Sequence, residues 1–390
     1  MKVMVINSLY YPNIIGGAEK STQVIVENLK KFDIEPVVLT ISDKEKVDHV
    51  NGIKVYYIQH SNVYWSYYSK TKNNILKIFW HIFSLYNFPI LKRVNKIIKE
   101  ENPDIVHTNN LSEFTVGLWR VIKKNKIPLL HTLRDYSLLC PRAILFKKED
   151  VCKRKNLLCT LILRFRRAFS RFPDAVAGNS KFILENHLES GFFKDSKKYI
   201  VYNSLESEEI NSNTKKTNRL NFGFIGQLSQ HKGIEFLLDV FKNSGISGLH
   251  IFGRGITADY EKYLRDRYGS KKISFHGFVK TGKALDIIDV LIVPSLWYDP
   301  LPRVIYEAYS AGIPVIGSDR GGIPEIIDIG KTGFVYNADS GKELIEMIKR
   351  FKKNPGIISD MIPLCLKKAE DFLPGKAVRR YVDIYMDISK

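Results

Sequence analysis

Short apolar segments alternate with longer amphipathic segments along almost the whole chain. A short run rich in Val, Ile and Leu predicts a buried strand, whereas apolar positions three and four residues apart predict a helix. In the first half, strands are predicted at 2–8, 35–41, 53–58, 104–109, 127–133, 174–180 and 199–204, and helices at 18–31, about 75–100 and 113–125. Strands that alternate with helices predict parallel sheets covered by helices on both faces.

The alternation starts again after a polar, aperiodic stretch at 206–220, which we predict to be a linker. Strands are predicted at 220–226, 248–253, 273–278, 290–295, 314–318 and 333–336, and helices at 233–243, 258–268, 281–288, 303–311 and 340–353. The chain is therefore expected to be an α/β protein with two doubly wound domains and a cleft between them. Ligands of such sheets bind beyond the carboxyl ends of the strands.

Composition agrees with two folded domains. The chain has 390 residues, of which 44% are hydrophobic, and only four cysteines. Cys140, Cys152 and Cys159 lack the spacing of a zinc site, so we interpret them as buried thiols in a reducing cytosol. Residues 1–12 lack the apolar run of a signal peptide, and the apolar stretch 75–91 is too short to span a membrane. A soluble cytoplasmic protein is expected.

Charge adds a further expectation. The formal net charge is +19, and two segments carry much of it. Residues 61–99 contain seven Lys or Arg and no acid, and residues 141–172 contain ten Lys or Arg against Glu149 and Asp150. Both segments interleave aromatic residues with the cations, which suits an anionic membrane surface and also suits nucleic acid. The alternative is that the aromatic side chains face a core. We favour the membrane surface.

Several residues with useful chemistry follow the predicted strands. Gly16 and Gly17 precede a helix, which would place bare N–H groups where an anion can bind, although a glycine pair is more often a turn. In the second half, "GQLSQHKG" at 226–233 places Lys232 just before a helix, and "IFGRG" places Arg254 between two glycines. Each signal is weak by itself.

The stretch 291–325 adds Asp299, Arg303 and Glu307 directly after a buried strand. If 303–311 is helical, Arg303 and Glu307 lie on one face, one turn apart. A carboxylate there can accept both hydroxyls of a ribose, and helix N-termini with nearby cations can neutralise a diphosphate. This stretch therefore predicts a site for a nucleotide and its attached sugar.

The segment "PSLWYDPLPRVIYEAYSAGIPVIGSDRGGIPEII" at 294–327 resembles the retaining glycosyltransferases of family 4 (glycosyltransferase group 1), which have the GT-B fold. Their signature is a carboxylate, seven residues and then Glu. "GGAE" at 16–19, "G-x-L-x-x-x-K-G" at 226–233 and "GKTGFVY" at 330–336 match as well.

The resemblance implies an acceptor-binding Rossmann-like domain at 1–205 and a nucleotide-sugar-binding Rossmann-like domain at 206–373. A C-terminal helix at 374–390 is expected to return to the first domain. The expected enzyme is a hexosyltransferase that retains the anomeric configuration of a nucleotide-diphosphate sugar and uses neither metal nor cofactor. From the charge we expect a lipid-linked saccharide acceptor in cell-surface polysaccharide synthesis, at the inner face of the cell membrane. A soluble sugar is the alternative acceptor.

By resemblance, Glu307 would bind the ribose, Asp299 would lie near the transferred sugar, and Lys232 would hold the diphosphate. The residues assigned in this way fall into three groups: catalytic, Asp299, Glu307, Arg134 and His131; donor-binding, Gly16, Gly17, Gly226, Lys232, Arg254, Leu301, Pro302, Arg303 and Glu307; and acceptor-side, His107, His131, Arg134 and Asp135.

Three positions depart from the family pattern. Asp299 replaces the usual Glu, and Gln227 stands where many relatives carry an Arg beside the diphosphate. Arg254, Arg303 and Arg320 are candidates to replace that charge. Arg134 stands where relatives often have His-Asp, and His131 nearby is equally consistent with a core histidine on a strand.

Three other classes of protein remain open at this point. The basic composition fits a nucleic-acid-binding protein, although we expect none to bind. A different two-domain α/β enzyme, such as a sugar-phosphate epimerase or a phosphorylase, has the same alternation. The departures at Gln227 and Arg134 also leave room for a sugar-nucleotide binder without activity.

Overall fold

The structure is a computed structural model, and it describes residues 1–65, 67, 73–147, 150–152, 157–208, 210, 220–246 and 248–390. The chain divides into two compact units. Unit 1 comprises Met1–Ile144, Lys153–Glu206 and Pro374–Lys390, and unit 2 comprises Leu145–Cys152 and Ser207–Leu373. Most of the predicted linker at 206–220 lies outside the described residues. Each unit is an α/β structure built on a mainly parallel sheet, as predicted.

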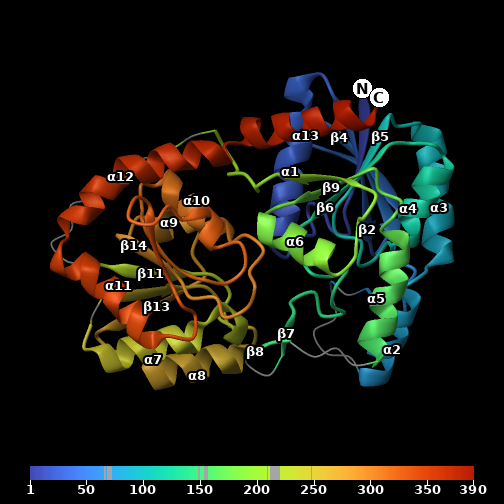
Figure 1. Cartoon of the computed structure of the whole chain (residues 1–390). Coiled ribbons are helices and arrows are strands. Elements are labelled where there is room, and N and C mark those ends of the chain that lie inside the picture. The colour runs from blue at the N-terminus through green and yellow to red at the C-terminus, as the bar shows by residue number, and fades with distance from the viewer. Residues whose placement is uncertain are drawn as a thin grey trace. The chain divides into compact units, whose positions relative to one another are not determined.

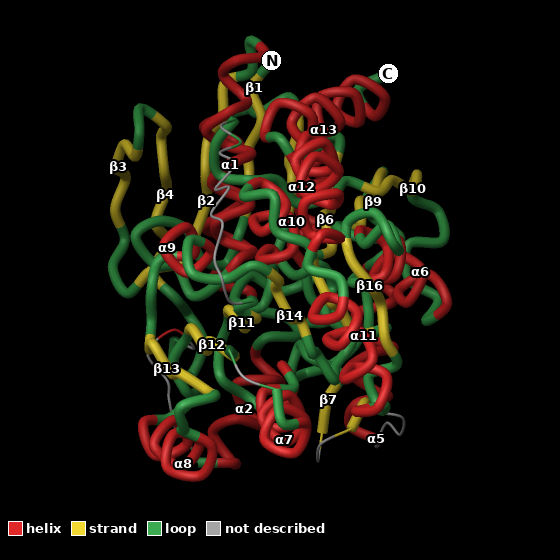
Figure 2. The backbone as a smooth tube through the Cα atoms, turned by 90° about the vertical axis from the view of Figure 1, so that its left-hand side faces the viewer, coloured by secondary structure: helices red, strands yellow, loops and turns green. Residues whose placement is uncertain are grey.

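Unit 1 contains an eight-stranded sheet with the order β10-β9-β6-β5-β1-β2-β4-β3. Its strands are β1 Lys2–Ile6, β2 Glu35–Ser42, β3 Lys46–Val50, β4 Ile53–Gln59, β5 Ile105–Thr108, β6 Leu129–Leu133, β9 Ala175–Gly178 and β10 Lys197–Ile200. All neighbours pair in parallel except β3 and β4, which form the antiparallel hairpin at the edge visible in Figure 2. The pattern missed β3 because four of its five residues are exposed, which removes the apolar run.

The helices of unit 1 cover both faces of this sheet. They are α1 Gly17–Leu29, α2 Asn74–Phe83, α3 Phe88–Glu101, α4 Gly117–Lys124, α5 Leu157–Phe169, α6 Lys181–Glu189 and α13 Pro374–Ile388. The C-terminal helix α13 packs beside α1, where Val378, Tyr381 and Tyr385 join the same buried cluster as Ile25 and Val3 (Figure 1). The predicted return of the C-terminal helix is therefore confirmed.

The single helix predicted at about 75–100 is wrong, because α2 and α3 are separate. The Asn87 side chain accepts a hydrogen bond from the Ile90 N–H at 3.3 Å and so caps α3. Pro89 occupies the first turn of α3, where a missing N–H costs nothing. A cap followed by proline starts a new helix here, although the apolar period continues across the break.

Unit 2 contains a six-stranded parallel sheet with the order β13-β12-β11-β14-β15-β16. Its strands are β11 Phe222–Ile225, β12 Leu249–Phe252, β13 Ile273–Gly277, β14 Val290–Val293, β15 Val315–Ser318 and β16 Gly333–Tyr336. Its helices are α7 Ile234–Ser244, α8 Ala258–Tyr268, α9 Thr281–Leu285, α10 Arg303–Ser310, α11 Gly341–Lys353 and α12 Gly356–Ala369. The strand order reverses between β11 and β14, which is where ligands bind in sheets of this kind.

The hairpin of β7 (Phe146–Lys147) and β8 (Asp150–Val151) groups with unit 2, whereas we expected all of 1–205 in one domain. The Phe146 ring lies 6.3 Å from the ring of His231, and this contact explains the grouping. A strand pair that packs away from its sequence neighbours leaves no local signal.

Candidate functional site

Four of the residues predicted to hold a nucleotide sugar lie after the carboxyl ends of β11 and β14 in unit 2: Lys232, Asp299, Arg303 and Glu307. The loop 226–233 follows β11, and the loop 294–302 follows β14. The backbone N–H groups of Leu296 and Trp297 donate to the His231 carbonyl at 3.0 and 3.3 Å. Hydrogen bonds therefore hold the two loops together at the switch point.

Glycine makes this close approach possible. Gly233 has φ +73°, and a Cβ atom there would lie 1.8 Å from the Pro294 carbonyl oxygen. Any other residue would push the loops apart. Gly321 has φ +64°, and its Cβ atom would lie 2.1 Å from the Asp299 carbonyl oxygen. The Gly322 N–H donates to that same oxygen at 2.8 Å, so the "GGIPE" turn fixes the backbone of Asp299.

Lys232 and Asp299 form the central ion pair of the site. The Lys232 Nζ donates to Asp299 Oδ2 at 2.5 Å, and the Ser295 hydroxyl lies 3.5 Å from the same oxygen. Asp299 is only 4% exposed, whereas the Lys232 side chain is 28% exposed and lies 5.3 Å from the centroid of the Trp297 ring. A buried carboxylate thus faces a cation that solvent can still reach.

His231 completes this group, although the sequence analysis did not single it out. Its ring contacts Trp297 edge-on at 5.3 Å. Burial and the neighbouring Lys232 lower the pKa of His231 to about 4, against a smaller opposite effect of Asp299. The imidazole is therefore neutral at physiological pH and can accept as well as donate a hydrogen bond.

Arg303 and Glu307 lie one turn apart on α10, as the spacing predicts. The Arg303 Nε lies 3.3 Å from Glu307 Oε1, and both side chains are mostly buried. Leu301 and Pro302 are buried immediately before the helix, and Pro302 at the N-cap provides no side-chain cap. The start of α10 can therefore offer backbone N–H groups to an anion.

The three arginines considered as replacements for a cation at Gln227 differ in their partners. Arg320 donates to Asp339 at 2.6 Å, and Arg303 pairs with Glu307. Arg254 is exposed and stacks over Phe278 at 5.7 Å, with no carboxylate of the described residues within ion-pair distance.

Arg254 also lies beside the loop that contains Gln227. The Leu228 N–H donates to the Arg254 carbonyl at 2.9 Å. A Cβ atom at Gly253 would lie only 1.8 Å from the Gly226 carbonyl oxygen, so the two backbone segments are in close contact. Arg254 is therefore the one of the three candidates that lies beside the Gln227 loop and forms no ion pair with a described carboxylate.

In unit 1, the helix start at Gly16 and Gly17 differs from expectation. The Gly16 N–H donates to Glu19 Oε2 at 2.8 Å, as in a capping box. Burial raises the pKa of Glu19. The Gly16 N–H therefore already donates its hydrogen bond to a carboxylate of the chain itself, so the expectation of bare N–H groups is wrong for this residue.

His107 and His131 both lie in the interior of unit 1. The His107 ring nitrogens contact the Tyr385 hydroxyl and the Thr132 hydroxyl, each at 2.7 Å. His131 Nδ1 lies 2.9 Å from the Thr108 hydroxyl, and its ring stacks on aromatic neighbours. Burial lowers the pKa of His131 to about 3 and that of His107 well below its usual value. These placements favour a structural role for both residues.

Arg134 is also internal, being 7% exposed. It donates to Asn109 at 3.0 Å, to the Asn203 side chain, and to the Tyr381 hydroxyl at 3.3 Å. It therefore ties α13 to the loops that follow the sheet. Its neighbour Asp135 is half-buried and accepts hydrogen bonds from other polar groups near the sheet edge.

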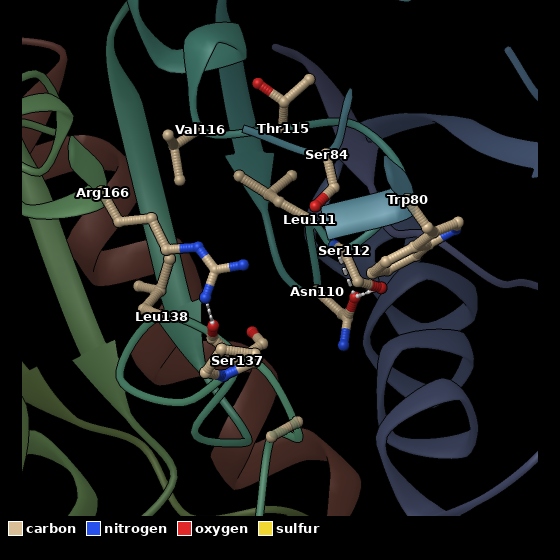
Figure 3. A pocket seen from close by; sticks show the side chains of 12 residues that line it. Trp80, Ser84, Asn110, Leu111, Ser112, Thr115, Val116, Ser137, Leu138 and Arg166 are labelled. Carbon is tan, nitrogen blue, oxygen red and sulfur yellow. Dashed lines mark hydrogen bonds between the residues drawn. The ribbon is translucent and has the colours of Figure 1, made fainter. Parts of the chain in front are cut away.

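A cavity of about 110 Å³ lies in unit 1, where the loops after β5 and β6 meet α2 and α5 (Figure 3). Its lining residues are Trp80, Ser84, Asn110, Leu111, Ser112, Thr115, Val116, Ser137, Leu138, Pro141, Ala143 and Arg166. The sequence analysis missed this cavity, because its walls come from four segments that share no motif.

Apolar side chains also gather on the outside of α2, of the turn from α2 into α3, and of α5. We call this region the α2–α5 surface; its exposed large apolar residues are Ile75, Leu76, Phe79, Ile82, Phe83, Tyr86, Phe88, Leu157, Leu158 and Leu161. These are ten of the 22 exposed large apolar residues of the described chain. The two helices are neighbours, because Trp80 of α2 and Arg166 of α5 line the same cavity.

Trp65, Trp80 and Phe165 are aromatic residues of the two basic segments, and insertion into a membrane surface would require them to be exposed. Instead, Trp65 is buried and the other two are half-buried. In the part of the chain that the structure describes, no helix is long and apolar enough to cross a membrane.

Three cysteines are less buried than the sequence predicts. Cys140, Cys152 and Cys159 are half-buried rather than buried as expected, and none of the described cysteines is in a disulfide. Within the described ranges, no group of three or more His, Cys, Asp or Glu is arranged to hold a metal ion.

Comparison with known proteins gives consistent matches along the chain. Residues 206–364 match the glycosyl transferases group 1, and residues 15–209 match Glycosyltransferase Family 4. An uncharacterised 42.6 kDa protein in the cps region of Klebsiella pneumoniae is 33% identical over 332 residues, which cover 84% of this chain and 87% of that protein. The lipopolysaccharide 1,2-N-acetylglucosaminetransferase of Salmonella typhimurium is 27% identical over 213 residues, covering 47% of this chain and 55% of that enzyme.

Solved structures share the fold at low identity. Anabaena Alr3699/HepE in complex with UDP has a TM-score of 0.73 at 17% identity and covers 99% of this chain and 100% of its own. Sucrose-phosphate synthase from Thermosynechococcus elongatus has a TM-score of 0.76 at 16% identity, covering 99% and 98%.

Proposed function

Because this chain belongs to the group 1, family 4 glycosyltransferases and has their GT-B fold, we propose that it moves a hexosyl group from a nucleotide-diphosphate sugar to a saccharide acceptor, with retention and without metal. Unit 2 would bind the donor and unit 1 the acceptor. The observation that carries this proposal is the convergence of Lys232, Asp299 and α10 on the switch point of the unit 2 sheet.

Each side chain of that group suits one part of the donor. Glu307, held by Arg303, would accept the ribose hydroxyls, and the start of α10 with Lys232 would face the diphosphate. Arg254 would supply the cation that Gln227 lacks. Asp299 would lie near the transferred sugar. Fixed cations and helix N–H groups stabilise a departing diphosphate electrostatically, which removes the need for a metal ion.

A panel of UDP-, GDP- and ADP-sugars tests the donor site by thermal stabilisation of the protein. UDP-sugars come first, since solved structures of similar fold hold UDP or UDP-glucose. We expect one class to stabilise the wild type and to stabilise Glu307→Ala much less. If no sugar nucleotide raises the melting temperature, donor binding by this chain is refuted.

For the acceptor, we propose a lipid-linked saccharide in cell-surface polysaccharide synthesis, used at the inner face of the cell membrane. Two relatives support this, one being a protein of a cps region and the other a lipopolysaccharide sugar transferase. The net charge of +19 and the α2–α5 surface support attachment to an anionic bilayer. Apolar side chains insert into the interface while nearby cations attract the headgroups. A soluble sugar remains the alternative acceptor.

A further inference from the structure

The cavity of unit 1 contains a cation whose charge the described residues do not neutralise. Arg166, on α5, extends its guanidinium toward Ser137 across from the loop that carries Asn110 and Ser112 (Figure 3). Its Nη1 donates to the Ser137 carbonyl, and no other described acceptor lies within hydrogen-bond distance. No carboxylate of the described residues lies within ion-pair distance of it.

The nearest acid, Asp135, is already engaged. Its two oxygens accept hydrogen bonds from the Asn110 amide at 2.6 Å and from the Ser137 N–H at 2.7 Å. Burial lowers the pKa of Arg166 to about 10, although the negative charge of Asp135 acts in the opposite direction. Arg166 is half-buried, and a cation that has lost part of its water and has one neutral acceptor is costly, because such groups are usually paired.

The position of the cavity also suits a ligand. Its walls are the loops that directly follow β5 and β6, which is the edge of a parallel sheet where ligands bind. Leu111, Leu138 and Trp80 provide apolar lining beside the polar groups (Figure 3). A pocket with apolar walls and one charged group fixes both the position and the orientation of a small ligand.

We propose that this cavity binds an anionic oxygen group, a carboxylate or a phosphate, with Arg166 as its ligand. The guanidinium has Nε and Nη2 available, which is the fork that matches two oxygens of such a group. The assignment of this group to the acceptor rests on the proposed function. Two sources share the chemistry: the carboxylate of an acidic sugar, and the phosphate of a lipid carrier.

The binding experiment uses the full-length protein without any sugar nucleotide. Methyl glucuronide, methyl glucoside and inorganic pyrophosphate are titrated by ligand-observed NMR. We expect an anionic probe to bind and the neutral glucoside to bind at least tenfold more weakly. Arg166→Gln should weaken anion binding at least tenfold, and Arg166→Lys should restore part of it. Arg164→Gln, an exposed change on the same helix, should leave binding unchanged.

The outcomes separate the two sources. Tighter binding of the glucuronide points to an acidic sugar, and tighter binding of pyrophosphate points to a lipid carrier. Because pyrophosphate can also reach Lys232 in unit 2, only the part lost in Arg166→Gln counts. If Arg166→Gln does not fold, Ser112→Phe fills the cavity and keeps the charge, and it should abolish the same binding.

Anion binding that is equal in wild type, Arg166→Gln and Ser112→Phe overturns the proposal, as does absence of binding in the wild type. Retained stabilisation by a sugar nucleotide in Arg166→Gln then shows that the donor site is intact. Failure of the cavity proposal is in this way distinguished from failure of the proposed function.

Discussion

The Lys232–Asp299 ion pair can be tested in two ways, because it should contribute both to the stability of unit 2 and to the proposed binding of the donor. Lys232→Met keeps the bulk of the side chain and removes its charge, which leaves the Asp299 carboxylate buried without its cation. Asp299→Asn removes the opposite charge, and the double variant removes both. Lys262→Met is the matched control, because Lys262 pairs with Asp266 at the same 2.5 Å distance in unit 2 but both side chains are exposed.

The structure sets the expected magnitudes. Breaking a buried pair costs about 3–5 kcal/mol, because one charge stays uncompensated. Lys232 is 28% exposed, so water screens part of the loss, and we expect about 2 kcal/mol for Lys232→Met. The double variant should cost less than the sum of the single variants, with a coupling of about 1–2 kcal/mol. Lys262→Met should have little effect on stability, because water screens an ion pair between two exposed side chains.

Urea unfolding followed by hydrogen exchange of peptides from β11 and β14 isolates unit 2 from unit 1. The same four proteins are then tested for stabilisation by a sugar nucleotide. We expect the double variant to regain stability and still to lose donor binding, because the diphosphate lacks its cation. A coupling of zero would show that the pair does not form. Normal donor binding by the folded double variant would remove Lys232 from the donor site.

Three further predictions concern donor, membrane and pH. Glu307→Ala should lower turnover strongly, since each lost charge-assisted hydrogen bond to the ribose is worth about 1.5–3 kcal/mol. The product of the wild-type enzyme should keep the donor's anomeric configuration, as followed by NMR, and should form at the same rate in the presence of EDTA. Wild-type protein should sediment with anionic vesicles and be released by salt, whereas replacing Phe79 and Phe83 by Ser should weaken sedimentation. Phe278→Ser, a change at a more exposed phenylalanine in unit 2, should not weaken it. Burial alone would raise the pKa of Glu101, but hydrogen bonds from its lysine and tyrosine partners lower it to about 2, below the ordinary 4.5. Its stabilising effect is therefore complete above pH 4.5 and is lost as pH falls toward 2, so Glu101→Gln should flatten the acid side of the stability curve; an unchanged acid limb contradicts the assignment.

Much of the fold was accessible from the sequence, because strand and helix periods are local properties. Apart from the exposed β3 and the separate β7–β8 hairpin, the strands coincide with predicted segments, although β10 shares only Tyr199 and Ile200 with the predicted 199–204. The break between α2 and α3 was missed, since Asn87 and Pro89 interrupt the backbone and not the apolar period. The motif around Asp299 and Glu307 likewise pointed to the candidate site in unit 2, because its glycines and charges are contiguous.

Pairing and burial, by contrast, depend on residues far apart in the chain. Lys232 and Asp299 are 67 positions apart, and only the parallel pairing of β11 with β14 brings them to 2.5 Å. The sequence does not show whether the His131 imidazole faces solvent or a core. In the folded chain it lies in the core, where its ring stacks on Phe193 and contacts the Thr108 hydroxyl.

The cavity of unit 1 shows the same division most clearly. The sequence by itself determined that 141–172 is strongly basic, but each of its arginines has the same local signal. Only the packing of α5 against the loops after β5 and β6 turned Arg166 inward and left Arg164 in solvent. The physical reason is that composition and period set how much charge and apolar surface a segment has. Tertiary contacts decide which of those groups lose water and which charges remain without a partner.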